Sequence, residues 1–178
     1  MTTYIAMLRG INVSGRNRLA MEDLRELVAT AGGEDVRTYI QSGNAVFRSR
    51  SSATAIVKAM ETGLEHSLGA KVPVLVRSKK ELDVVMKMNP FFLRGDEITT
   101  LHVTFMGEVP APADVKAARA KAVDADELQV IRREVYLHCP NGYGNTKLTN
   151  AFFEKKFGSE ATTRNWKTVT TLAEMAQR

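Results

Sequence analysis

The chain of 178 residues carries 25 Lys and Arg against 20 Asp and Glu, a net charge of +5, and 44% of its residues are hydrophobic. This apolar content excludes a disordered chain, and the lack of any apolar run of about 18 residues excludes a membrane-spanning helix. The N-terminus lacks the features of a secretory signal peptide, and the single cysteine, Cys139, excludes an internal disulfide. We therefore expect a reduced, cytoplasmic protein that does not bind membranes. The positive charge is concentrated in residues 9–18, which contain three arginines and no acidic residue.

Hydrophobic periodicity predicts the order β-α-β-β-α-β over the first part of the chain. Residues 3–9 alternate as a strand, and apolar residues spaced i, i+3, i+4, i+7 predict a helix over 24–31. Short β-rich runs at 36–40 and 44–48 flank a hairpin turn, and a helical stripe at 56–68 precedes a strand at 72–76. This order is that of a ferredoxin-like fold.

The pattern restarts after a linking helix, which begins at a capping box, Ser78 to Glu81, and ends at Asn89-Pro90. A strand at 101–105, a helix beginning at Pro112, strands near 127–132 and 134–139, and a helix through 148–152 follow. We therefore expect an α+β protein with two fused ferredoxin-like halves, βαββαβ and βαββα, mainly antiparallel sheets and a C-terminal helix. The expected divisions are a first half at 1–77, a linking helix and loop at 78–97, and a second half at 98–178.

The first strand is apolar on both faces, with Tyr4, Ala6 and Leu8 on one and Ile5 and Met7 on the other. A strand buried on both faces needs a cover, and we expect the second half to supply it. An open single-sheet RNA platform is disfavoured for the same reason.

The loop after the first strand, residues 9–18, is predicted to meet the hairpin at 41–44. Strands 1 and 2 of a ferredoxin-like sheet run parallel, so both end at the same edge. The loop also has the G-x-x-x-x-G spacing of phosphate-binding loops. Arg16 and Asn17 replace the usual Lys and Ser/Thr, which argues against triphosphate hydrolysis and leaves anion binding. The alternative is a turn-rich loop with solvated arginines.

Two C-terminal segments, 141–147 and 162–167, lead into predicted helices and contain cations. Helix N-termini favour anions, and Arg164 with Trp166 would suit phosphate contact and stacking. The alternative is that Asn145 or Thr146 simply caps the first of these helices and that Trp166 anchors the last one.

Strand parity places Leu101, Val103 and Phe105 toward the helices and His102 on the reverse face, together with Tyr136 and His138 from a neighbouring strand. These three side chains are candidates for an acid–base patch, the alternative being a polar interface. His138 and Cys139 point to opposite faces of a strand, which excludes a Cys–His nucleophile and favours a packed Cys139. The three histidines lack metal-ligand spacing, so we expect no metal site.

Five short segments spread along the chain form a recognisable set: Arg9-Gly10-Ile11-Asn12-Val13, Tyr39-Ile40-Gln41-Ser42-Gly43-Asn44, Asn89-Pro90-Phe91, Gly142 with Lys147-Leu148, and Thr162-Thr163-Arg164-Asn165-Trp166. In this order they resemble the bacterial domain-of-unknown-function family 1697. The resemblance implies a cytoplasmic α+β protein of two ferredoxin-like pieces and no assigned activity. Ser14 and Arg16 depart from the family's G-I-N-V-G-G-K loop, which keeps a cation but changes its geometry. Cys139 stands where the family usually has an aromatic residue, which weakens any catalytic role of the thiol.

The leading functional hypothesis is the binding of a phosphate-bearing anionic ligand, a nucleotide or a nucleic acid, without a cofactor. Arg16 and Arg18 would neutralise phosphate, glycines would allow close approach, and Asn12 and Asn44 would orient the ligand. The alternatives are a small-molecule enzyme with a cleft between the halves, where Arg164 and Lys147 would hold an anionic substrate, and a structural or partner-binding module. Whether a reaction is catalysed, and the oligomeric state, stay open. The candidate ligand-binding residues are Arg9, Gly10, Asn12, Gly15, Arg16, Arg18, Gln41, Ser42, Asn44, Lys147, Arg164, Asn165 and Trp166.

Overall fold

The computed structural model describes residues 1–122 and 125–178, which form two compact units. The first unit comprises Met1–Asp83 with Leu172–Arg178, and the second comprises Val84–Thr171. The divisions fall within two helices, α3 (Lys79–Met88) and α7 (Trp166–Gln177). Among the described residues, no helix has the length and apolar character needed to cross a membrane.

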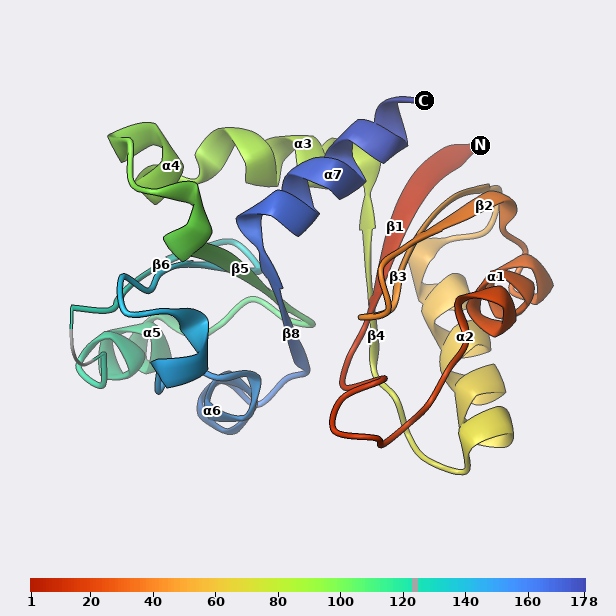
Figure 1. The fold of residues 1–178 in the computed structure, drawn as a ribbon, viewed down its shortest axis with the longest axis horizontal. Helices are drawn as coiled ribbons and strands as arrows, with labels where there is room; N and C mark the ends of the chain where they lie inside the picture. The colour runs from red at the N-terminus through yellow and green to blue at the C-terminus, as the bar shows by residue number, and fades with distance from the viewer. Residues whose placement is uncertain (123–124) are drawn as a thin grey trace. The chain divides into compact units, whose positions relative to one another are not determined.

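The first unit is a four-stranded antiparallel sheet with two helices on one face (Figure 1). The strand order β2-β3-β1-β4 is that of a ferredoxin-like sheet, and it confirms the predicted order β-α-β-β-α-β. Because β1 and β2 both pair antiparallel with β3, they run parallel to each other. The elements are β1 (Thr2–Leu8), α1 (Met21–Thr30), β2 (Glu34–Tyr39), β3 (Asn44–Ser49), α2 (Ala53–Leu68) and β4 (Val74–Ser78).

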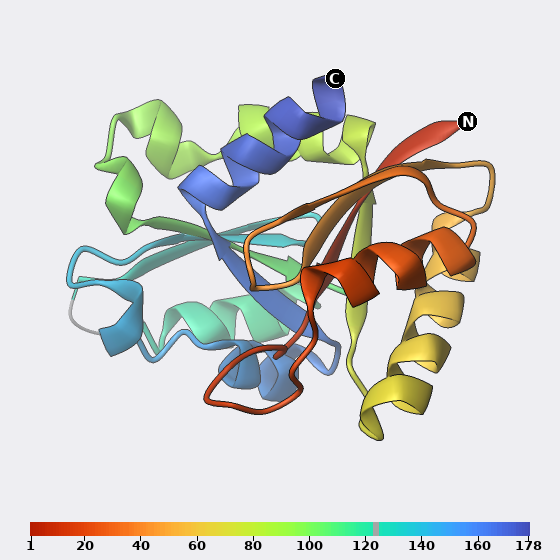
Figure 2. The same ribbon diagram turned by 45° about the vertical axis from the view of Figure 1, so that its right-hand side comes forward.

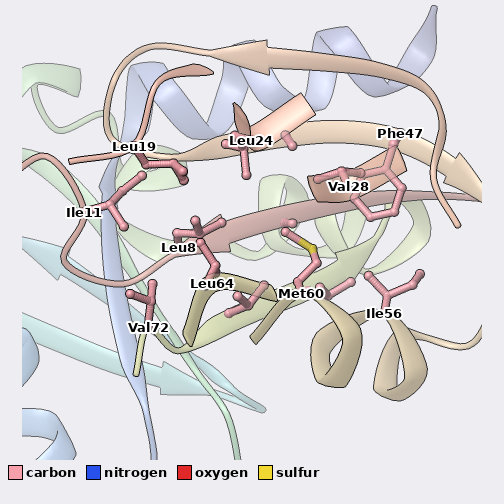
Figure 3. Close-up of a cluster of buried hydrophobic side chains, with 14 of the residues drawn as sticks. Leu8, Ile11, Leu19, Leu24, Val28, Phe47, Ile56, Met60, Leu64 and Val72 are labelled. Atoms are coloured by element: carbon pink, nitrogen blue, oxygen red, sulfur yellow. The ribbon is translucent and has the colours of Figure 1, made fainter. Parts of the chain in front are cut away.

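The core of the first unit lies between its sheet and the apolar faces of α1 and α2. Figure 3 shows Leu8 from β1 packed among Leu24 and Met60 from the two helices, all three fully buried. Burying such a side chain stabilises the fold by roughly 1.5–3 kcal/mol. Ile5 and Met7, on the other face of β1, are also fully buried, so both faces of this strand are covered.

Strand β2 lies at one edge of this sheet and is irregular. Its register against β3 shifts between Glu34 and Arg37, and Asp35 between them has a positive φ of 54°. Glu34 and Asp35 are exposed to solvent. The edge of the sheet is therefore bulged and charged.

The second unit repeats the same topology, with strand order β6-β7-β5-β8. It contains a further strand that the sequence pattern does not indicate, β8 (Ala161–Asn165), which makes it a complete β-α-β-β-α-β and not β-α-β-β-α. The segment Ala-Thr-Thr-Arg-Asn lacks apolar alternation and was interpreted as the lead-in to a helix. The other elements are α4 (Pro90–Arg94), a 3₁₀ turn (Ile98–Thr100), β5 (Leu101–Met106), α5 (Pro112–Arg119), β6 (Glu127–Ile131), β7 (Glu134–His138), a 3₁₀ turn (Tyr143–Asn145) and α6 (Asn150–Phe157).

The two faces of the second sheet are the reverse of the expected ones. Thr104 bonds Thr163, which in turn donates to Asn150 at the start of α6, so Thr104 and His102 face α5 and α6. The opposite face carries Tyr136, whose hydroxyl donates to the carbonyl of Val85 in α3 over 3.1 Å. The parity prediction was wrong because β5 is buried on both faces, so hydrophobicity does not reveal which face the two helices cover.

A candidate anion-binding loop

Residues 9–18, which we call the arginine loop, form a miniature hairpin between β1 and α1. The amide of Asn12 donates to the carbonyl of Asn17 over 3.1 Å, and that of Arg16 donates to Val13 over 3.0 Å. Ser14 and Gly15, at the tip, both have positive φ, 50° and 75°. A hydrogen-bonded two-residue turn with two positive φ values is the pattern of a type I′ turn.

Apolar anchors hold the two ends of the miniature hairpin on the core. Ile11 and Leu19 are 1% and 6% exposed, and Figure 3 shows both beside Leu8 at the end of β1. Figure 2 shows the loop (red-orange) extending from the sheet before the chain enters α1. The core of the first unit therefore holds both ends of the exposed part of the loop in place.

Asn12 joins the arginine loop to the hairpin at residues 41–44, so the predicted convergence of the two segments is observed. Its Nδ2 donates to the carbonyl of Leu19 over 2.9 Å and to that of Gln41 over 2.8 Å, and its Oδ1 accepts from the Leu19 amide over 2.9 Å. Both N–H groups of the carboxamide are thus used within the protein. Asn12 positions the loop, in contrast to its predicted role of orienting a ligand.

The hairpin residues Ser42 and Asn44 also have internal roles. Asn44 is fully buried, and its Nδ2 donates to the Tyr39 carbonyl and to the Ser42 hydroxyl, each over 3.0 Å. A buried carboxamide cannot reach a ligand in solution, so the predicted orienting role of Asn44 was wrong. Gly43 between them has a φ of 78°, and a Cβ there would lie 2.5 Å from Cδ1 of Ile11.

Unusual backbone conformations gather at this edge of the first sheet. Gly10, Asn12 and Asn17 have φ values of 68°, 54° and 47°, and Ile40, beside the hairpin turn, has a φ of 50°. A β-branched residue with positive φ is a conformational outlier that costs on the order of 1–3 kcal/mol. Strain of this kind is concentrated at functional sites.

A surface cavity of about 610 Å³ adjoins the arginine loop, and we call it the first cavity. Its charged lining residues are Arg9, Arg16 and Lys71, and none of the described residues that line it is acidic. Gly10 and Ser14 also line it. The charged residues in the described lining of the cavity are therefore all cations.

Lys71 is a lining residue of the first cavity that the sequence pattern did not indicate. β4 runs antiparallel to β1, with Leu8 opposite Val74, so the residues before Val74 lie beside those after Leu8. The amide of Arg9 accordingly donates to the carbonyl of Pro73 over 2.9 Å. The topology already expected from the sequence contains this juxtaposition, since strand 4 of such a sheet starts at the edge where strand 1 ends.

A second cavity of about 530 Å³ adjoins the same loop and differs in chemistry. It is lined by Asn12, Gly15, Arg18, Leu19, Ala20 and Gln41. Arg18 and Gln41 are exposed. The described residues that line the two cavities all belong to the first unit.

The arginine loop differs from a nucleotide-hydrolase phosphate loop in its backbone. The amides of Asn12 and Arg16 are bonded within the miniature hairpin. Helix α1 begins only at Met21, and its N-cap residue, Ala20, makes no side-chain capping bond. An anion at this loop would therefore be held mainly by cationic side chains, and less by a backbone cradle than the glycine spacing suggested.

The predicted ligand-binding residues of the second unit are largely structural. Arg164 is 8% exposed, and its guanidinium donates to Oγ1 of Thr162 over 2.8 Å and to the Thr163 carbonyl over 2.9 Å. Burial away from water lowers its pKa to about 10. Trp166 is 2% exposed and lies 5.4 Å from the Phe92 ring. The expectation that both side chains are exposed for phosphate contact and stacking was wrong.

Helix capping explains the remaining residues of these segments. Oδ1 of Asn165 accepts from the Thr168 amide over 2.8 Å at the start of α7. Thr149, and neither Asn145 nor Thr146, caps α6 by accepting from Phe152. Lys147 is exposed on the second unit.

His102, Tyr136 and His138 do not form one acid–base patch. The His102 ring stacks on Tyr143 at 4.7 Å, on the sheet face opposite to that of Tyr136. Burial lowers the pKa of His102 and raises that of Tyr136. His138 instead bonds Glu127 over 3.0 Å. Sequence parity missed this because it placed all three on one face.

Glu127 belongs to an ion-pair cluster on the second unit. Arg94 donates two hydrogen bonds to its carboxylate, over 2.7 and 3.0 Å, and also pairs with Asp96. The Arg94 bonds hold the pKa of Glu127 down at about 2. Within residues 1–122 and 125–178, no group of three His, Cys, Asp or Glu side chains is placed to hold a metal ion.

Comparisons with known proteins agree with the fold. The conserved bacterial protein SP0830 from Streptococcus pneumoniae has a similar structure, with a TM-score of 0.78 and 23% identity, covering 100% of this chain and 99% of that one. No curated protein is detectably similar in sequence. A family model described as "Protein of unknown function (DUF1697)" matches residues 1–136.

Proposed function

Because the chain belongs to DUF1697, a family without an assigned activity, we propose its function from the arginine loop: binding of a phosphate-bearing ligand, a nucleotide in preference to a nucleic acid. The observation that carries the proposal is the first cavity, where Arg9, Arg16 and Lys71 meet with no acidic residue in the described lining. Arg16 and Lys71 bring two positive charges to this cavity, and an anion bound there would be attracted by both.

The residue types and the size of the cavity suit a nucleotide. A guanidinium matches two phosphate oxygens at once, and a lysine adds a compact charge that adapts to a third. The volume of about 610 Å³ falls within the usual range for small-molecule sites, roughly 300–1,000 Å³. A nucleic acid would instead need a basic surface that extends along its backbone.

The test is calorimetric titration of the full chain with pyrophosphate and with ADP, at low and high salt. Arg16→Ala is expected to weaken both ligands by about tenfold to a hundredfold, since a charge-assisted hydrogen bond contributes roughly 1.5–3 kcal/mol. Arg16 is exposed, so the variant should keep its fold. Salt should weaken binding to the unaltered protein because it screens exposed charges.

The matched control is Lys58→Ala, which removes one exposed positive charge from α2 in the same unit. The control should leave both affinities unchanged. Equal losses in the two variants, or affinities that ignore salt, would contradict the proposal. A single-stranded oligonucleotide that binds much more tightly than ADP would shift the assignment to a nucleic acid.

A further inference from the structure

The second cavity combines apolar and hydrogen-bonding groups, unlike the cationic first cavity. Leu19 and Ala20 supply apolar surface, and Gln41, which carries a carboxamide, also lines it. Arg18 is the one charged residue among the described residues of the lining. An aromatic heterocycle, with apolar faces and polar edges, matches this lining better than a phosphate group does. The volume of about 530 Å³ accommodates such a ring.

The two cavities share a wall, which is the miniature hairpin of the arginine loop. Ser14 and Arg16 line the first cavity, whereas Gly15, between them in sequence, lines the second. The two turn residues at the tip of this wall, Ser14 and Gly15, have small side chains or none. A ligand that crosses the tip would occupy both cavities.

Arg18 marks the place where such a ligand would cross. A Cβ built on Gly15 would lie 4.0 Å from Nη2 of Arg18, so the guanidinium is beside the turn. This places a cation next to the wall, where the phosphate nearest the sugar of a nucleotide would lie.

We propose that the second cavity binds the base of an adenine nucleotide whose phosphates occupy the first cavity. This inference rests on the proposed function and adds a specificity-determining residue, Gln41. A carboxamide offers a donor and an acceptor side by side, which matches N7 and the amino group of adenine. The Gln41 main chain is fixed by its hydrogen bond from Asn12, so its side chain starts from a defined point.

The experiment compares pyrophosphate, ADP and GDP on the full chain and on Gln41→Ala by calorimetry. ADP is expected to bind at least tenfold more tightly than pyrophosphate, and several-fold more tightly than GDP. Gln41→Ala should weaken ADP about tenfold and leave pyrophosphate unchanged, since the variant loses the two hydrogen bonds to the base and none to the phosphates. Gln129→Ala, at an exposed glutamine of the second unit, is the matched control and should change neither ligand.

The outcomes separate this inference from the proposed function. ADP and pyrophosphate of equal affinity, both sensitive to Arg16→Ala, would overturn the base site and leave the phosphate site standing. Equal affinities for ADP and GDP, or an ADP affinity unaffected by Gln41→Ala, would overturn the role of Gln41. Failure of pyrophosphate and of all nucleotides to bind would remove both. Because Gln41 is exposed, a thermal unfolding curve should confirm that the variant folds.

Discussion

Individual side chains at the edge of the first sheet divide into those that shape the site and those that face the cavities. Sequence patterns predicted which segments converge there. They did not predict which side chains bond within the protein and which face the cavities. Asn12 and Asn44 were predicted to contact a ligand, and both are consumed by hydrogen bonds to main-chain carbonyls of the protein. A one-dimensional pattern cannot show whether an asparagine faces the protein or the solvent, because polar residues satisfy buried backbone groups as readily as they bind ligands.

Gly43 gives a test of how tightly the hairpin packs on the loop. Gly43→Ala should lower the free energy of unfolding by roughly 2–4 kcal/mol, because the added Cβ meets Ile11 and also requires a strained φ. Urea unfolding followed by circular dichroism measures the loss. Gly69→Ala is the matched control: its φ is 67°, but a Cβ there has no neighbour within 4 Å in the described structure, so only strain of roughly 1–2 kcal/mol is expected. Equal losses in the two variants would contradict close packing of Ile11 against the hairpin.

Helices and most strands follow directly from the sequence because their signals are local. The capping box at the start of α3 is present: Glu81 accepts from the Ser78 amide over 2.7 Å, and the Glu81 amide donates to the Ser78 hydroxyl over 3.3 Å. Pro112 occupies the first turn of α5 as expected. β8 was not predicted, since its polar residues are specified by pairing with β5 and not by their own pattern.

The capping box predicts a measurable contribution to stability. Ser78→Ala should lower the free energy of unfolding by about 1 kcal/mol, because the hydroxyl of an N-cap serine satisfies an otherwise unbonded amide. Ser67→Ala is the matched control within α2, where the serine hydroxyl bonds only the Leu64 carbonyl one turn earlier. The control should be neutral or slightly stabilising, since alanine is the better helix former. A loss in Ser67→Ala as large as that in Ser78→Ala would argue against the capping contribution.

The whole chain is a structural repeat that its sequence shows only in part. The sequence predicted the repeated order of elements. The residues that are equivalent in the two units are identified by the pairing register of their strands. Arg77 lies opposite Ile5 in the first sheet, and Arg164 lies opposite Val103 in the second. Each arginine is buried and stands one residue before the side chain that caps the next helix, Ser78 or Asn165. The two units therefore share a residue pattern at the end of their fourth strands.

The pKa of Glu127 predicts how the stability of the whole chain depends on pH in acid. Its pKa is held at about 2 in the folded state, below the usual value of 4.5, so its ion pairs stabilise the fold above pH 4.5. That stabilisation is lost as the pH falls from 4.5 to 2. The unaltered protein should have a higher urea midpoint than Glu127→Gln at pH 7, and the difference should vanish near pH 2.

Glu65→Gln, at an exposed position of α2, is the control for this titration. Its urea midpoint should stay close to that of the unaltered protein at both pH values. A difference between the Glu127 variant and the unaltered protein that persists at pH 2 would contradict the assignment to the ion pairs with Arg94.

The irregular outer strand of the first unit bears on how the protein behaves at high concentration. A regular strand at the margin of a sheet can recruit the same strand of another molecule and start a growing fibre. The register shift between Glu34 and Arg37 interrupts the row of groups that such recruitment needs, and exposed charges there repel a second copy in register. The bulge in β2 should therefore disfavour aggregation through this edge of the first sheet.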